Sequence, residues 1–211
     1  MTLLHNHEPV LPEITPNNDP WDPIVSLRQH GRHVLTSVEM TVTHLCNMRC
    51  EHCAVGDTLV MKEEPFLPLP LMLKRLDEVE HLQTISITGG EPALLEKTVD
   101  EVIVPLLKYA RERGIRSQIN SNLTLDIGRY EKMLPYLDVM HISHNYVDAD
   151  NFHAVGFANS GRPVPSAAAS RLYEKMMENS LQLSKMGMFI SAESMINYRT
   201  HTRLPEIHQL I

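Results

Sequence analysis

The stretch "VLTSVEMTVTHLCNMRCEHC", residues 34–53, joins two different patterns end to end. Its first ten residues, 34–43, are rich in β-branched side chains and predict a β-strand. The following residues carry all three cysteines of the 211-residue chain, Cys46, Cys50 and Cys53, at a C-x3-C-x2-C spacing. The sequence therefore places three thiols in a loop directly after a strand.

Outward from this stretch, apolar runs typical of strands alternate with runs of helical spacing. Each "strand then helix" pair predicts a β/α unit of a parallel sheet with right-handed crossovers. We predict an α/β protein with a partial (β/α)6 TIM-like barrel, of which about five β/α units are present. The further predicted strands are 84–88, 115–122, 139–145 and 189–197, and the predicted helices are 69–79, 99–110, 130–137, 166–186 and 204–211.

Two local signals refine one of these helices. Thr98 and Glu101 resemble a capping box and predict that the helix begins there. Pro105 falls inside the same apolar pattern and predicts a kink or a later start, because proline cannot donate a backbone hydrogen bond. The helix is expected to end at Gly114.

The chain divides into an arm and a core. Residues 1–33 form a proline-rich N-terminal arm, with five prolines in the first 23 residues, which discourage regular structure. Residues 34–211 form the core domain, which we expect to be incomplete at its C-terminus because the last helical pattern has no ending signal. A missing barrel wall predicts exposed apolar side chains on the last strand, among them Phe189, Ile190 and Ile196.

Composition narrows the function classes. The net charge is −7 and there is no dense Lys/Arg run, so we expect no nucleic-acid partner. No apolar run approaches ~18 residues, so we expect no membrane span. The first residues lack the pattern of a secretory signal, and three clustered thiols fit a reducing compartment. We therefore expect a cytoplasmic protein.

Three clustered thiols admit more than one metal. Thiolates favour zinc, copper(I) or iron–sulfur clusters. A structural zinc site needs a fourth ligand, which His44 or His52 could supply, but it would usually show a second ligand pair further along the chain. An electron-transfer cluster generally has four cysteines. Three cysteines on one loop leave one iron of a cubane without a protein ligand, and an open position is where a substrate or cofactor binds.

The cysteine loop resembles the hallmark of the radical S-adenosylmethionine (SAM) superfamily. Its form "CNMRCEHC" is similar to the C-N-x-R-C-x-H-C pattern of members that modify peptides and proteins. The resemblance implies a [4Fe-4S] cluster held by Cys46, Cys50 and Cys53, with SAM as the ligand of the fourth iron. It also makes residues 34–211 a radical SAM core domain.

A second motif supports the resemblance one strand later. "ITGGEP", residues 87–92, closes the second predicted strand as the family's G-G-E-x segment does. Glycines let a backbone approach a ligand closely, and a carboxylate accepts hydrogen bonds from an ammonium group. The resemblance implies that Gly89, Gly90 and Glu91 bind the methionyl amino group of SAM.

Polar residues at later strand ends complete the candidate cofactor site. "NSN" ends the third strand where the family often has T-N-G, so Ser121 and Asn122 match and the glycine does not. "SHN" ends the fourth strand and supplies Ser143 and Asn145. Together with His52 of the cysteine loop, Asn122, Ser143 and Asn145 are predicted cofactor-binding residues, because β/α barrels build their sites at this edge.

The resemblance implies an activity. A radical SAM enzyme cleaves SAM reductively to a 5′-deoxyadenosyl radical that abstracts hydrogen from a substrate, here an unknown one of the peptide or protein class. More narrowly, the chain resembles the YfkAB-type (YfkB-like) branch, although it lacks that branch's downstream cysteine motif. Expected partners are a reductant such as flavodoxin or ferredoxin, and a C-terminal partner chain. The alternative is a zinc-binding module or an iron–sulfur electron-transfer and interaction module.

Overall fold

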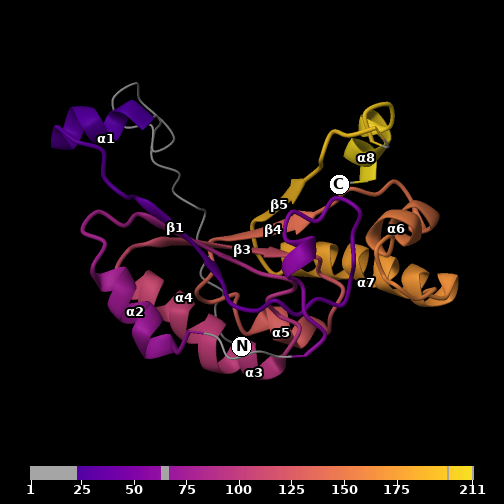
Figure 1. Cartoon of the computed structure of the whole chain (residues 1–211), viewed down its shortest axis with the longest axis horizontal. Helices are drawn as coiled ribbons and strands as arrows, with labels where there is room; N and C mark the ends of the chain where they lie inside the picture. The colour runs from indigo at the N-terminus through magenta and orange to yellow at the C-terminus, as the bar shows by residue number, and fades with distance from the viewer. Residues whose placement is uncertain (1–22, 63–66, 199, 211) are drawn as a thin grey trace.

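The computed structural model describes residues 23–62, 67–198 and 200–210. Within them the chain forms a parallel sheet whose strands lie in sequence order, β1-β2-β3-β4-β5 (Figure 1). Every strand falls inside a predicted range, which confirms the α/β class and the parallel β/α architecture. The strands are β1 Ser37–Thr41, β2 Thr84–Thr88, β3 Arg116–Ser121, β4 Val139–Ser143 and β5 Ile190–Glu193.

Helices alternate with the strands and gather on one side of the sheet. In Figure 1, α2, α3, α4, α5 and α7 lie along the same face of the sheet, whereas α1 and α8 stand apart from that face. The helices are α1 Pro23–His30, α2 Leu69–Asp77, α3 Glu96–Thr98, α4 Val104–Glu112, α5 Ile127–Glu131, α6 Ala149–Gly156, α7 Ser166–Lys185 and α8 Leu204–Leu210, with short turns at η1 Gly56–Thr58 and η2 Val99–Ile103.

The core lies between these helices and the apolar side of the sheet. Side chains of a strand alternate between the two faces, so every second residue points toward the helices. On the central strands these are Ile85, Ile87, Ile119 and Met140, which are all fully buried. Burying each such side chain stabilises the fold by roughly 1.5–3 kcal/mol. We call this side the covered face.

The helix after β2 begins earlier than predicted. Val99 N donates to Leu95 O (3.2 Å), so hydrogen bonding already starts before Thr98. Thr98 is buried inside the helix and its side chain accepts no capping bond. The predicted capping box is therefore wrong.

Pro105 is accommodated by a change of helix type. Residues of η2 form a π-helical turn, in which Val104 N donates to Val99 O, immediately before α4. Proline lacks an N–H and its ring crowds the carbonyl four positions earlier, and the wider π-turn just upstream absorbs the misfit. Gly114 ends this helix with φ +66°, as predicted.

Two further helices differ from the sequence patterns. α5 lies a few residues before the predicted 130–137, because Asp126 Oδ1 accepts from Gly128 N (3.0 Å) and sets an earlier start. Pro135 prevents a regular continuation. α6 was not predicted at all, although Asp148 Oδ1 caps it by accepting from Asn151 N (2.7 Å).

The described ends of the chain carry exposed residues. The first 22 residues of the predicted arm lie outside the described residues, and the rest of the arm contains α1 and is exposed from Leu27 onward. At the β5 side, Phe189 and Ile196 are exposed, as expected for the last strand, whereas Ile190 is half-buried. Among the described residues, no helix is both long and apolar enough to cross a membrane.

Candidate functional site

The cysteine loop leaves the carboxyl end of β1 and carries three free, half-buried thiols. Met48 N approaches Cys46 Sγ at 3.4 Å, and Tyr146 Oη lies 3.8 Å from Cys50 Sγ. Tyr146 is buried and follows β4, so the loop reaches across the sheet. The thiols are therefore held at the edge where all five strands end.

Arg49 fixes the shape of the loop from inside. Its guanidinium donates to the carbonyl oxygens of Cys46 (2.8 Å), Met48 (2.7 Å) and Val60 (3.2 Å). A planar guanidinium offers five donors in a rigid fork, so one side chain can satisfy several carbonyls of a tight loop. Arg49 thus orders the backbone that carries the first two cysteines.

The end of α6 supports the same loop from outside. Arg49 N donates to Gly156 O (2.9 Å) and Glu51 N donates to Val155 O (2.9 Å). The Asn159 side chain donates to Cys50 O (3.2 Å). These bonds join the loop after β1 to the segment after β4.

Gly89 and Gly90 lie against the cysteine loop. A Cβ at Gly89 would stand 2.3 Å from Thr43 O, and one at Gly90 would stand 2.2 Å from Leu45 O. Gly90 N donates to Thr43 O (2.9 Å), and Glu91 N donates to Leu45 O (2.7 Å). Gly89 also has φ +155°, which strains any other residue. The glycines allow the turn after β2 and the cysteine loop to interlock.

The Glu91 side chain links the turn after β2 to the end of β3 by hydrogen bonds on the covered face. It accepts from Ser121 Oγ (2.9 Å), Asn122 N (2.8 Å) and Ala93 N (3.2 Å). The residue is 1% exposed, and this burial raises the pKa of the carboxyl to about 7. The sequence predicts that this carboxylate faces the cofactor's ammonium group. The structure shows it as a brace between strand ends, and its contact with a cofactor stays a prediction.

The turn after β3 is held in an unusual conformation. Leu123 is fully buried and has φ +52°, a left-handed conformation that a leucine rarely adopts. It occupies the position at which the T-N-G pattern has its glycine. Asn179 of α7 secures the turn by donating to Leu123 O (2.7 Å) and Leu125 O (2.8 Å).

Asn122 connects this turn to the cysteine loop. Its amide donates to Asn47 Oδ1 (2.9 Å), and Asn47 Nδ2 donates to Thr124 Oγ1 (2.8 Å). Thr124 Oγ1 in turn donates to Asn122 Oδ1 (2.7 Å). The three side chains close a ring of hydrogen bonds beside Cys46.

The end of β4 meets the last part of the cysteine loop. Asn145 is buried, and its Nδ2 lies 3.1 Å from His52 Nε2. Its Oδ1 accepts from Met195 N (2.5 Å). Burial lowers the pKa of His52, whose Nδ1 is buried without a hydrogen-bond partner. Ser143 is exposed at the end of the strand.

The predicted site residues therefore gather at one edge of the sheet, on loops that contact one another. Sequence reasoning did not assign roles to several side chains that hold them there. Asn47 and Arg49 were visible as the Asn and Arg letters of the quoted loop pattern. Tyr146 had no signal, because its contact with Cys50 depends on tertiary folding.

Burial disfavours the thiolate form of the cysteines, so a nearby positive charge is needed to ionise them. Burial raises the pKa of Cys46 to about 12 and that of Cys50 to about 11. Thiolates are nevertheless the form that binds metals. Metal cations supply the charge that makes buried thiolates favourable, so the chemistry of this donor set fits an iron–sulfur cluster.

Nowhere in residues 23–62, 67–198 and 200–210 do three or more His, Cys, Asp or Glu side chains gather closely enough to hold a single metal ion.

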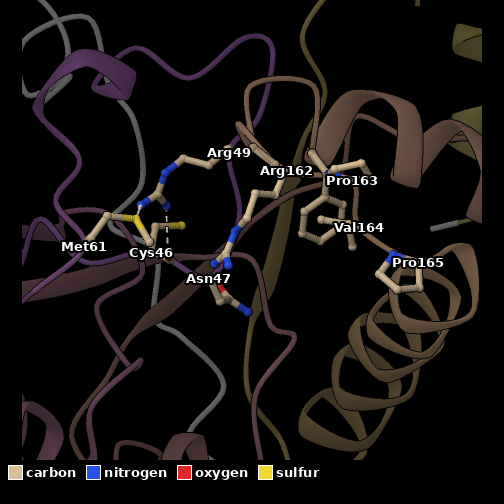
Figure 2. Close-up of a pocket in the computed structure, with 10 residues that line it drawn as sticks. Cys46, Asn47, Arg49, Met61, Arg162, Pro163, Val164 and Pro165 are labelled. Atoms are coloured by element: carbon tan, nitrogen blue, oxygen red, sulfur yellow. Dashed lines mark hydrogen bonds between the residues drawn. The ribbon is translucent and has the colours of Figure 1, made fainter.

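A cavity of about 370 Å³ opens beside Cys46 (Figure 2). The cysteine loop forms one wall, and the segment between α6 and α7 forms the other. Figure 2 shows the Arg162 side chain extending from that segment toward Asn47. A guanidinium in this position is suited to a carboxylate. The lining residues are Cys46, Asn47, Arg49, Met61, Phe157, Ser160, Arg162, Pro163, Val164 and Pro165.

Comparison with known proteins places this site in a family context. Residues 40–191 match the model of the radical SAM superfamily. The chain is 54% identical over 198 residues to protein YfkA of Bacillus subtilis (strain 168). The aligned residues make up 94% of this chain and 53% of YfkA. The chain thus spans about half the length of this relative. The identity agrees with the predicted YfkAB-type branch.

Solved structures share the fold at low sequence identity. Streptococcus suis SuiB bound to its precursor peptide SuiA matches with TM-score 0.64 and 15% identity, over 92% of this chain and 42% of SuiB. Native anSMEcpe with bound AdoMet matches with TM-score 0.62 and 15% identity, over 83% of this chain and 48% of that one. These likenesses confirm the partial-barrel architecture.

Proposed function

The chain belongs to the radical SAM superfamily, and on that premise we propose that Cys46, Cys50 and Cys53 hold a [4Fe-4S] cluster whose fourth iron binds SAM. The observation that carries this proposal is the interlocking of the cysteine loop with the turn at Gly89 and Gly90. Their backbones approach so closely that no other residue fits at either glycine. The two motifs thus form one site.

The residues around that site bind the cofactor in this proposal. The backbone of Gly89–Glu91 faces the cysteine loop. The Glu91 carboxylate, which also holds Asn122 in place, is the proposed acceptor for the methionyl ammonium group of SAM. Arg162 and Asn47 line the cavity beside Cys46, where the carboxylate of SAM is the matching group. The proposed cofactor-binding residues are His52, Gly89, Gly90, Glu91, Asn122, Ser143 and Asn145.

When bound, the cluster and SAM supply a 5′-deoxyadenosyl radical that abstracts hydrogen from a substrate. The chain's own residues position these groups and keep water from them. For the substrate we propose a peptide or protein, because the loop has the form of peptide-modifying members and SuiB, a structural neighbour, binds a precursor peptide. The reductant is a flavodoxin or ferredoxin, and the compartment is the cytoplasm.

Anaerobic reconstitution tests the cluster. Wild-type protein should bind about four irons and four sulfides per chain on the cubane model. Cys46→Ala, Cys50→Ala and Cys53→Ala should each lose the bound cluster, because each removes one ligand. Thr58→Ala, an exposed residue of the same loop, is the matched control and should keep its iron.

Two readouts separate this proposal from its alternatives. Stoichiometric zinc in place of iron would identify a zinc-binding module. A cluster that is present but never cleaves SAM to 5′-deoxyadenosine after dithionite reduction would identify an electron-transfer module. Iron retained in all three cysteine variants would remove the assigned ligands.

A further inference from the structure

The second face of the sheet carries a line of hydrogen-bonded polar side chains. Gln118 Nε2 donates to Ser86 Oγ (3.1 Å), and Gln118 Oε1 lies 2.9 Å from His141 Nε2. His141 Nδ1 lies 3.4 Å from Glu193 Oε1. The line crosses from β2 to β5 and ends at the strand ends that also carry the cysteine loop. We call this side the open face, because no helix of the described residues lies across it in Figure 1.

The direction of these bonds sets the state of His141. Since the Gln118 amide nitrogen donates to Ser86, its carbonyl oxygen faces His141 and can only accept. With this orientation of the Gln118 amide, His141 Nε2 is the donor. In the neutral imidazole this leaves Nδ1 as an acceptor, and Nδ1 is buried without a hydrogen-bond partner.

Two acceptors that face each other need a donor between them. His141 Nδ1 and the Glu193 carboxylate are such a pair; at 3.4 Å a proton fits between them, and a ligand's donor group can reach both only from the side. The neighbouring strand supplies a third acceptor. Asn120 is the register partner of His141 on β3, and its buried Oδ1 also has no hydrogen-bond partner. Unsatisfied buried acceptors are rare in folded proteins and call for an explanation.

Two carboxylates occupy strand positions of this face. They are Glu39 in the middle of β1 and Glu193 at the end of β5, and both are exposed. The only Lys or Arg at a strand position of this face is Arg116, at the opposite end of β3. A donor that enters near His141 is therefore favoured further if it is positive.

We propose that Asn120 Oδ1, His141 Nδ1 and Glu193 Oε1 bind a cationic hydrogen-bond donor of the substrate, an amine or guanidinium group. The inference rests on the proposed function, because it names a chemical group in the substrate of the same site. Charge-assisted bonds of this kind are stronger than bonds between neutral groups. The open face is the substrate platform, and the acceptor set selects lysine-like or arginine-like groups.

Peptide binding by fluorescence anisotropy tests this directly. The probes are three labelled heptapeptides of glycine and serine whose central residue is arginine, glutamine or glutamate. Reconstituted wild-type protein with SAM should bind the arginine peptide about tenfold more tightly than the glutamate peptide, on the scale of one charge-assisted hydrogen bond. Agmatine, added as competitor, distinguishes the source. Competition shows that a free cation suffices, and its failure assigns the site to a peptide side chain.

Variants make the test specific. Glu193→Gln should remove most of the preference for arginine, and Asn120→Ala should weaken the arginine peptide by about threefold, as for a neutral hydrogen bond. Glu112→Gln, an exposed residue at the end of α4 on the covered face, is the matched control and should keep the preference.

Other results would overturn the proposal. Two results would show that the three acceptors do not select a positively charged group. One is equal binding of all three peptides by the wild type, and the other is a preference for arginine that survives in Glu193→Gln. Iron content and 5′-deoxyadenosine are measured on the same samples. Failure of those two contradicts the proposed function, whereas peptide preference is read independently by anisotropy.

Discussion

The two faces of the sheet are built from alternate residues of the same five strands, yet they differ in burial and polarity. On the covered face, Ile85, Ile119 and Met140 are fully buried against helices. On the open face, Gln118 and His141 are half-buried and bond to each other. The difference shows that one face stabilises the fold and that the other is available for chemistry.

The largest effect is expected from the covered face. Ile119→Ala removes a fully buried side chain from the middle of the sheet and should lower the free energy of unfolding by about 2–5 kcal/mol, because transfer and cavity costs add. Denaturant unfolding measures it. A loss below about 1 kcal/mol would mean that the helices do not pack tightly on this face.

A second prediction uses the buried carboxyl of the covered side. The pKa of Glu91 is raised from 4.5 to about 7 by burial. A raised folded-state pKa of a carboxyl contributes stability that is fully present below its unfolded value and is lost as pH rises through 7. A shift of this size corresponds to about 3 kcal/mol.

The comparison with Glu91→Gln isolates this effect. Between pH 4.5 and 7, the cluster-free wild type should lose about 3 kcal/mol of unfolding free energy relative to the variant, which cannot titrate at this position. Urea unfolding at several pH values measures the difference. Parallel pH profiles of the two proteins would contradict the predicted burial cost.

The smallest effect is expected from the open face. Gln118→Ala, next to Ile119 but on the opposite side, breaks the bonds to Ser86 and His141. Because a hydrogen bond between neutral groups contributes only about 1 kcal/mol net, the free energy of unfolding should fall by roughly 1 kcal/mol for each bond, less than the cavity cost of Ile119→Ala. The same unfolding experiment measures it beside Ile119→Ala. Equal losses in both variants would erase the distinction between the faces.

Much of the fold was readable because its signals are local. Apolar runs typical of strands located all five strands, and Gly114 marked the end of a helix. The errors fall where local signals compete. Thr98 resembles a cap, but hydrogen bonding from Val99 had already started the helix. Next to Pro105 the helix changes type: a π-turn precedes α4, which begins at Val104.

The candidate site was readable only in part. The spacing of the motifs was enough to identify Cys46, Cys50, Cys53 and the two glycines as candidate site residues. Glu91 was predicted to face a cofactor, and that contact stays a prediction; its bonds to Ser121 and Asn122 were not foreseen. The positive φ of Leu123 could not be foreseen, since leucine carries no signal for it and Asn179 holds the turn from a distant helix.

The sequence by itself determined the β/α order, the cysteine loop and the turn after β2, because each depends on residues that are neighbours in the chain. Only the tertiary structure decided which groups meet. Tyr146 approaches Cys50, Asn145 approaches His52, and Asn120 lies beside His141 because parallel strands bring distant segments into register. A single strand shows which residues alternate, but the helices that pack on the sheet decide which face is covered and which stays open.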